Sequence, residues 1–307
     1  MRGNELLDKM ELIEPAYVEA AELKPKGKKN IRIKWGAMAA CLCLVVMGIM
    51  FWNQHEPTPN EATGPTVSEN GVTIPQLKVS LSANEAADML AFFIYQGRCY
   101  VQYEWIYDNV DIVGEYLGTA IGLIDEWTSQ DGYVELAGSI SGDFYAVNGY
   151  DPSFMLCMKD ETGAVITYIC NNGITLKYGS ELYEDRLHLS GSIESVQYES
   201  RDSWYASRGE RYQMNSINDT VLDFIAGMDS GLFIPYDAVP LNGKAYISET
   251  ELYHLYFRMK NGTSVHLRLH ENGYVRFDGM WALCIQVPEE NYNALLNLLD
   301  NHTDSAE

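Results

Sequence analysis

The chain has 307 residues, with 21 Lys and Arg against 43 Asp and Glu, so its formal net charge is −22. Apolar residues make up 47% of it, which is enough to bury a core and excludes a disordered acidic tail. The acidity argues against nucleic acid as a partner, because phosphate binding needs a basic surface.

The first 34 residues are predicted to form a cytoplasmic tail. In residues 4–23, NELLDKMELIEPAYVEAAEL, apolar residues recur at helical spacing against Glu and Asp, and Pro15 divides the pattern into two short helices. About twenty residues cannot build a core of their own, so the stripe binds a partner or lies on the membrane. Its acidic polar face favours a protein partner. The stripe consists of Leu6, Leu7, Met10, Ile13, Tyr17 and Val18.

Residues 35–52, WGAMAACLCLVVMGIMFW, are predicted to form a single transmembrane helix. The run carries no charge and would extend about 27 Å, close to the thickness of a bilayer's hydrocarbon core. Trp35 and Trp52 suit the two interfaces. A cleaved signal peptide is disfavoured, because the preceding region is too long and no small-x-small site follows the run.

Basic residues set the orientation of this predicted helix. A basic flank precedes it, whereas the first basic residue after it is Lys78. By the positive-inside rule the N-terminus is cytoplasmic, and the C-terminal domains lie outside the cell membrane. The flank consists of Lys24, Lys26, Lys28, Lys29, Arg32 and Lys34.

The leader resembles that of a group of known membrane proteins. The segment ELLDKMELIEPAYVEAAE, the lysine run and KWGAMAACLCLVV together are similar to the N-terminal leaders of single-pass proteins of gut Clostridia described as anti-sigma factors. The resemblance covers about 50 of the 307 residues and implies a cytoplasmic sigma factor as the partner of the apolar stripe. The tail has no His or Cys, so it lacks the spacing of zinc-binding anti-sigma domains. The outer region resembles uncharacterised domains on similar leaders, which implies no activity.

Residues 53–76 are predicted to form a flexible stalk. Four prolines with many Thr, Asn, Glu and Gly residues cannot bury enough apolar surface to offset chain entropy.

Residues 77–205 are predicted to form a β-rich extracytoplasmic domain. Ser82 and Glu85 form a capping box for a first helix whose apolar stripe ends at Phe93. Alternating strands follow, with a Gln-Gly turn in the first hairpin and the loop DETG in a later one. That loop would place Lys159 opposite Ala164.

Residues 206–307 are predicted to form a small α+β domain. NDTVLDFIAGMDSG indicates a helix ending at Gly231, and two strands follow, joined by Lys260-Asn261-Gly262. ENGYVRF indicates a third strand, and Pro288 opens a last helix. The predicted fold class is therefore α+β: a single membrane-spanning helix, a mostly antiparallel β domain and a small α+β domain.

Four cysteines, Cys99, Cys157, Cys170 and Cys284, lie in the predicted outer region. In the predicted hairpin, Cys157 and Cys170 share a face but stand four positions apart, roughly 13 Å. That exceeds the reach of a disulfide. We favour four buried free thiols.

A polar strand face stands out in the second domain. His266, Arg268 and His270 emerge on one face, Leu267 and Leu269 on the other, and His254 lies on the partner strand. A metal site or an anion-binding patch is one interpretation, but zinc needs three or four converging ligands. We favour a solvated face of a half-buried sheet.

The pattern as a whole indicates a membrane-anchored sensor or regulatory protein. Its tail would bind a cytoplasmic regulator, residues 35–52 would contact membrane lipid, and the outer region would meet an unknown extracytoplasmic ligand. The alternative is a surface-displayed binding module for an envelope glycan or protein, without signalling. No metal site, cofactor or catalytic residue is predicted, since G-x-S-x-G, S-x-x-K, H-E-x-x-H, Walker A and G-x-G-x-x-G are absent. An envelope hydrolase using paired carboxylates ranks third.

Overall fold

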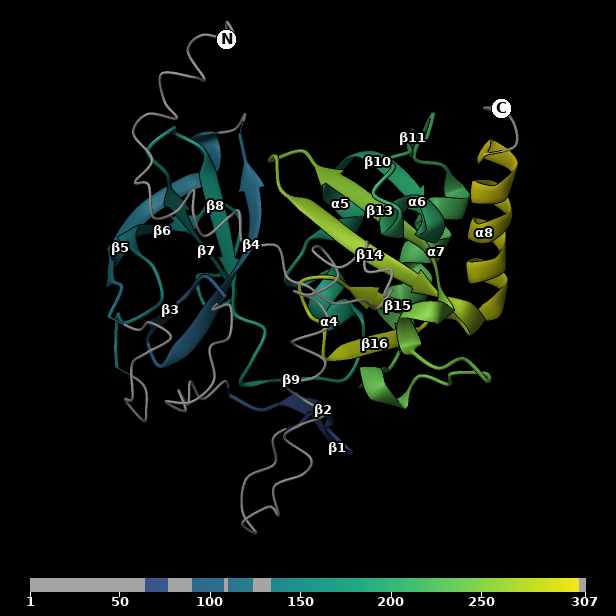
Figure 1. The fold of residues 1–307 in the computed structure, drawn as a ribbon, viewed down its shortest axis with the longest axis horizontal. Coiled ribbons are helices and arrows are strands. Elements are labelled where there is room, and N and C mark those ends of the chain that lie inside the picture. The colour runs from purple at the N-terminus through teal and green to yellow at the C-terminus, as the bar shows by residue number, and fades with distance from the viewer. Residues whose placement is uncertain (1–63, 77–89, 108–109, 124–133, 304–307) are drawn as a thin grey trace, which may run out of the picture. The chain divides into compact units, whose positions relative to one another are not determined.

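The computed structural model describes residues 64–76, 90–107, 110–123 and 134–303 (Figure 1). The predicted tail and span at residues 1–52, with the stripe from Leu6 to Val18, lie outside the described residues. Within the described ranges, no helix is long and apolar enough to cross a membrane. The described residues all belong to one compact unit.

A small three-stranded sheet includes part of the predicted stalk. Its strands are β1 (Thr66–Ser68), β2 (Gly71–Ile74) and β9 (Ile174–Leu176), in the order β1-β2-β9. Residues 64–76 are therefore an ordered hairpin rather than flexible chain. The turn at Asn70-Gly71 closes it, with Gly71 at a φ of 117°, and Val72 and Ile74 are buried.

The second sheet has six antiparallel strands in the order β3-β4-β8-β7-β6-β5. Its strands are β3 (Phe92–Tyr95), β4 (Arg98–Ile106), β5 (Val113–Ile121), β6 (Ser141–Val147), β7 (Met155–Lys159) and β8 (Val165–Ile169), with the 3-10 helix η1 (Val110–Ile112) before β5. Phe93, expected on a helix, lies in β3 and is fully buried. Gln96 and Gly97 both have positive φ and close the predicted turn between β3 and β4.

The β7–β8 hairpin forms where predicted, but its register differs by one residue. Lys159 pairs with Val165 rather than with Ala164, and Cys157 pairs with Thr167. The reason is a longer loop, because the Asp160 carboxylate accepts hydrogen bonds from the backbone N–H groups of Thr162 and Ala164. Such side-chain-to-backbone bonds stabilise a turn and fix the pairing beyond it.

The prediction of free thiols is confirmed. Cys99, Cys157, Cys170 and Cys284 are buried and form no disulfide. Burial raises the pKa of Cys99, Cys157 and Cys284 to about 12, so these thiols stay protonated at neutral pH.

The third sheet has seven antiparallel strands in the order β11-β10-β13-β14-β15-β16-β12 (Figure 1). They are β10 (Ile193–Ser200), β11 (Arg211–Gln213), β12 (Phe233–Pro235), β13 (Glu251–Met259), β14 (Ser264–His270), β15 (Tyr274–Phe277) and β16 (Leu283–Gln286). β10 belongs to this sheet although its residues precede the expected domain boundary after residue 205. The predicted β13–β14 turn forms, with the Met259 N–H donating to the Thr263 carbonyl.

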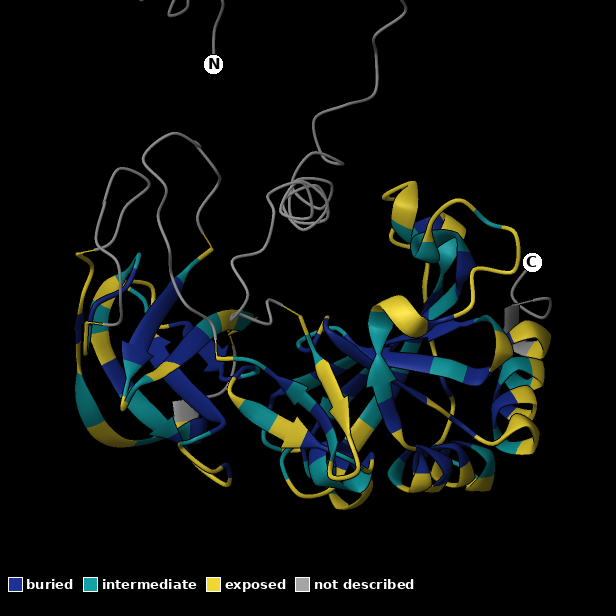
Figure 2. Cartoon of the chain, turned by 90° about the horizontal axis from the view of Figure 1, so that it is seen from below, coloured by how far each residue is buried: buried dark blue, intermediate teal, exposed yellow. Residues whose placement is uncertain are grey.

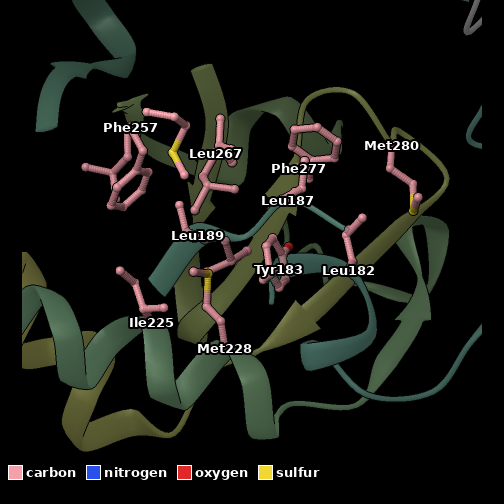
Figure 3. Packing of buried hydrophobic residues seen from close by; sticks show 14 of the residues in the cluster. Leu182, Tyr183, Leu187, Leu189, Ile225, Met228, Phe257, Leu267, Phe277 and Met280 are labelled. Atoms are coloured by element: carbon pink, nitrogen blue, oxygen red, sulfur yellow. The ribbon is translucent and has the colours of Figure 1, made fainter. Parts of the chain in front are cut away.

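Helices cover the apolar face of the third sheet. They are α4 (Ser180–Tyr183), α5 (Leu189–Ser192), α7 (Asp219–Ser230) and α8 (Glu289–Thr303). The predicted helix at 218–231 is confirmed as α7, and the Asn218 side chain caps it by accepting from the Val221 N–H. Figure 3 shows Ile225 and Met228 of α7 on the side of Phe257 and Leu267, and all four share one buried cluster with Leu182.

The remaining helices lie on the other face or in connections. They are α6 (Arg201–Tyr205) and the 3-10 helices η2 (Tyr236–Ala238), η3 (Ile247–Thr250) and η4 (Glu271–Gly273). Figure 2 shows that exposed residues gather on helices and connecting loops, whereas the strands are mostly buried or intermediate. Residues 64–303, as far as they are described, therefore form mostly antiparallel sheets with short helices, an α+β arrangement.

We expect Leu267→Ala to destabilise the protein strongly. Leu267 is fully buried at the centre of the third sheet, and emptying such a position costs about 2–5 kcal/mol of unfolding free energy. Urea denaturation of the purified chain measures it. The matched control is Leu222→Ala on α7, which is 43% exposed and should change stability by less than about 1 kcal/mol. Equal losses of unfolding free energy in Leu267→Ala and Leu222→Ala would contradict the burial of Leu267 under the helices.

Candidate functional site

The face of the third sheet opposite the helices is polar. Alternation along β13 and β14 places Leu255, Phe257 and Leu267 on the helix side and the polar residues opposite. The predicted common face of His266, Arg268 and His270 thus forms, with His254 directly opposite Arg268. The polar face of these two strands carries His254, Tyr256, Arg258, Ser264, His266, Arg268 and His270.

The interpretation of this face as solvated is wrong. His254 and His270 are 0% exposed and Arg268 is 5% exposed. Two segments cover them, because the Trp204 ring of α6 stacks on His254 at 4.6 Å and the Tyr236 ring of η2 lies 5.4 Å from His270. The sheet is therefore buried on both faces at this end.

Five residues on this face form a closed ring of polar contacts, here called the charge ring: Glu251, His254, His266, Arg268 and Asp278. Arg268 Nε donates to Asp278 Oδ1 at 2.6 Å, and its Nη1 lies 3.4 Å from Glu251 Oε1. The two imidazoles complete the ring. His266 Nδ1 lies 3.1 Å from Asp278 Oδ2, His266 Nε2 lies 2.9 Å from His254 Nδ1, and His254 Nε2 lies 3.4 Å from Glu251 Oε2.

The contacts of the two imidazoles assign their protons. His254 Nε2 makes no hydrogen bond, but a lone pair there would face the Glu251 carboxylate, so this nitrogen carries a proton. His254 Nδ1 then accepts from His266 Nε2, so the hydrogen bond between the two rings runs from His266 to His254.

Charge pairing within the ring shifts the pKa values of its acids. Burial raises the pKa of Glu251, but the contact from His254 and the Arg268 charge outweigh it and lower that pKa to about 2. Burial opposes ionisation of Asp278 too, yet His266 and Arg268 hold its pKa well below the usual range. The pKa of His254 is lowered, mainly by burial. Both carboxylates are thus ionised at neutral pH, and His254 is neutral.

A cleft of about 510 Å³ opens beside the charge ring. His266 and Asp278 form its border with the ring, and their side chains are 13% and 31% exposed. The opposite wall comes from β4, where a bulge between Gln102 and Glu104 presents two successive residues to the same side. The residues lining the cleft are Tyr103, Glu104, Ser195, Gln197, Arg211, Tyr256, Arg258, Ser264, His266 and Asp278.

Hydrogen bonds fix the β4 wall against the third sheet. The Tyr103 hydroxyl donates to the Ser264 carbonyl at 3.0 Å, and Glu104 Oε2 accepts from the Ser264 N–H at 2.9 Å. Burial raises the pKa of Glu104, although the bonds from Ser264 oppose that rise. The cleft is consequently a pre-formed feature bounded by two sheets.

The aromatic ring in the cleft is already covered. The Tyr256 ring stacks with His266 at 4.4 Å, and the Arg211 guanidinium lies 4.0 Å from the Tyr256 centroid. His266 and Arg211 come from strands on opposite sides of β13, so they cover both faces of Tyr256. Glu199, which is 2% exposed, fixes Arg211 through an ion pair of 3.3 Å. Tyr256 therefore offers no free face on which a sugar or a base could stack.

His266 and Asp278 of the cleft are held by partners within the charge ring. Both ring nitrogens of His266 and both oxygens of Asp278 have partners within the charge ring. Such groups are poorly placed to exchange protons with a substrate. Among the described residues, no three His, Cys, Asp or Glu side chains are placed to hold a metal ion. The arrangement suits binding of a polar ligand.

The structure leaves the predicted partner-binding stripe of Leu6, Leu7, Met10, Ile13, Tyr17 and Val18 untested, because it lies outside the described residues. Sequence reasoning missed Glu251, Asp278 and Trp204, which complete or cover the charge ring. Alternation in ELYHLYFRM could have revealed His254, Tyr256 and Arg258 as one polar row. Comparison with protein-family models, curated proteins and solved structures gives no match.

We expect Glu251→Gln to remove a pH-dependent part of the stability. The pKa of Glu251 lies at about 2 in the folded chain against an ordinary 4.5, so its contribution, about 3 kcal/mol, is complete above pH 4.5 and is lost as the pH falls towards 2. Urea denaturation at several pH values should show wild type and variant converging in acid.

The matched control for that experiment is Glu210→Gln. Glu210 is half exposed and pairs with Arg208 on the surface, so its removal should cost under about 1 kcal/mol at every pH. If the difference in unfolding free energy between wild type and Glu251→Gln stays constant down to pH 3, the lowered pKa of Glu251 is contradicted.

Proposed function

We propose that the chain is a membrane-anchored extracytoplasmic sensor whose outer region binds a ligand in the cleft and whose tail contacts a cytoplasmic regulator. The cleft bordered by the charge ring carries the proposal. Buried charges contribute little net stability compared with apolar residues of the same volume, so a buried network of this size favours a role in recognition. The covered acid and base groups favour binding over turnover.

Two features of the sequence support the membrane-anchored layout. The uncharged run at 35–52 suits a single span, and the basic residues before it favour a cytoplasmic N-terminus. The resemblance of the leader to those of anti-sigma factors makes a sigma factor the regulator we propose for the stripe from Leu6 to Val18.

A surface-displayed binding module is the second candidate. The same cleft would serve it, and the tail would be no more than the flank of an anchor. The two functions differ in what residues 4–23 bind, so the tail decides between them.

The proposed topology predicts one-sided protection from protease. In intact cells stripped of their wall, external protease should degrade an epitope at the C-terminus and leave one at the N-terminus intact. Immunoblotting before and after lysis measures both. Degradation of the N-terminal epitope, or survival of both epitopes, in intact cells would contradict the single inward-facing tail.

The proposed signalling role predicts a partner that depends on the tail. Pull-downs from native membranes should recover a sigma factor with the full chain and not with a chain lacking residues 4–23. A second variant keeps the chain length and the charge: Leu6→Ser with Ile13→Ser removes only apolar residues of the stripe and should also lose the partner, because the proposed contact is apolar. Identical partners for all three chains would favour the binding module.

A further inference from the structure

We infer that the cleft binds a small oxyanion, a carboxylate or a phosphate, through Arg258. This inference deepens the proposed function by naming the ligand chemistry of the same cleft.

Arg258 lines the cleft with no acceptor bonded to its guanidinium. In the part of the chain that the structure describes, it makes no hydrogen bond or ion pair, although its charge acts on Glu104 in the same cleft, whereas Asp278 is held by Arg268 and His266. Arginine presents a planar fork of donors that matches carboxylate and phosphate oxygens. An anion would supply the acceptors that Arg258 lacks.

Register places hydroxyl groups on both sides of Arg258. Ser195 of β10 and Ser264 of β14 are its direct partners across the neighbouring strands, and all three line the cleft. Adjacent strands lie about 4.8 Å apart, so both serines stand within reach of an anion bound to Arg258. The Ser195 hydroxyl can donate to a second oxygen of that anion.

A second guanidinium approaches the same place. The Arg211 guanidinium lies over Tyr256, which is two positions from Arg258 on the same strand face, roughly 6.6 Å along β13. Arg211 pairs through Nε with Glu199 and also lines the cleft. Two positive groups thus face one volume in a chain whose net charge is −22.

The acidic groups of the cleft do not cancel this preference. Asp278 is paired with Arg268 and His266, and Arg276 lies 3.7 Å from its Oδ1. Glu104 already accepts the Ser264 N–H through Oε2, and burial raises its pKa, while the bonds from Ser264 and the Arg258 charge oppose that rise. Of the two tyrosines that line the cleft, Tyr256 offers no stacking surface to a neutral sugar, since both of its faces are covered. The unpaired donors therefore favour an anion.

Calorimetric titration of the purified full chain tests the inference. The probes are succinate, its uncharged diamide, inorganic phosphate and the zwitterion alanine, all at matched ionic strength. We expect succinate or phosphate to bind with a Kd in the millimolar range or tighter, and the diamide not to bind. Tighter binding of succinate would identify the ligand class as carboxylates, and tighter binding of inorganic phosphate would identify it as phosphates.

Variants assign the binding to the cleft. Arg258→Gln should weaken it about tenfold or more, because a hydrogen bond to a charged group is lost, and Ser195→Ala about threefold. The matched control is Arg208→Gln, since Arg208 pairs with Glu210 on the surface and does not line the cleft. Thermal unfolding of each variant, within a few degrees of wild type, shows that the fold is retained.

Several results would overturn the inference: no binding of either oxyanion, equal binding of the diamide, or unchanged affinity in Arg258→Gln. Alanine binding that Glu104→Gln abolishes and Arg258→Gln leaves intact would overturn it as well. None of these results bears on the pull-down of a tail-dependent partner or on the protease protection. Those two experiments therefore test the membrane-anchored sensor function independently of the oxyanion inference.

Discussion

Burial of the Arg268 guanidinium is the constraint on which the polar half of the third sheet depends. A guanidinium removed from water needs carboxylates in contact with it. Glu251, the first residue of β13, and Asp278, the residue after β15, supply them. The imidazoles of His254 and His266 contact each other and connect the Glu251 carboxylate to the Asp278 carboxylate. Trp204 of α6 can then lie flat on His254, because no charge beneath it is left without a partner. The cleft begins where this cover ends.

Local signals predicted the local structure well. Asn261-Gly262 marks a turn and forms one, and the apolar stripe of α7 is buried as its spacing predicts. The same dipeptide signal at Asn70-Gly71 was outweighed by the polar, proline-containing composition around it, so that hairpin was missed. Phe93 was misassigned because a helical stripe and a short strand both place it on an apolar face.

Long-range packing explains why the site itself was not predicted. The alternation of polar and apolar residues in β13 and β14 identifies which side chains share a face, but not what lies on it. α6 packs there from a position some fifty residues earlier in the chain, and Asp278 joins from beyond β15. Such contacts depend on which distant segments pack on the sheet, and the periodicity of a strand does not encode that. Arg268 is buried because these distant segments pack on its face.

The four unbridged thiols make the fold independent of the redox state around it. Nothing in the described sheets needs an oxidant to mature, so material made in a reducing compartment would have the same core as material made outside the cell. Each thiol also reports local unfolding, because a buried thiol reacts with an alkylating reagent only when the structure around it opens. Cys99 and Cys157 lie in the second sheet and Cys284 in the third. Mass-resolved alkylation kinetics would therefore reveal whether the two large sheets unfold in one cooperative step or as separate units.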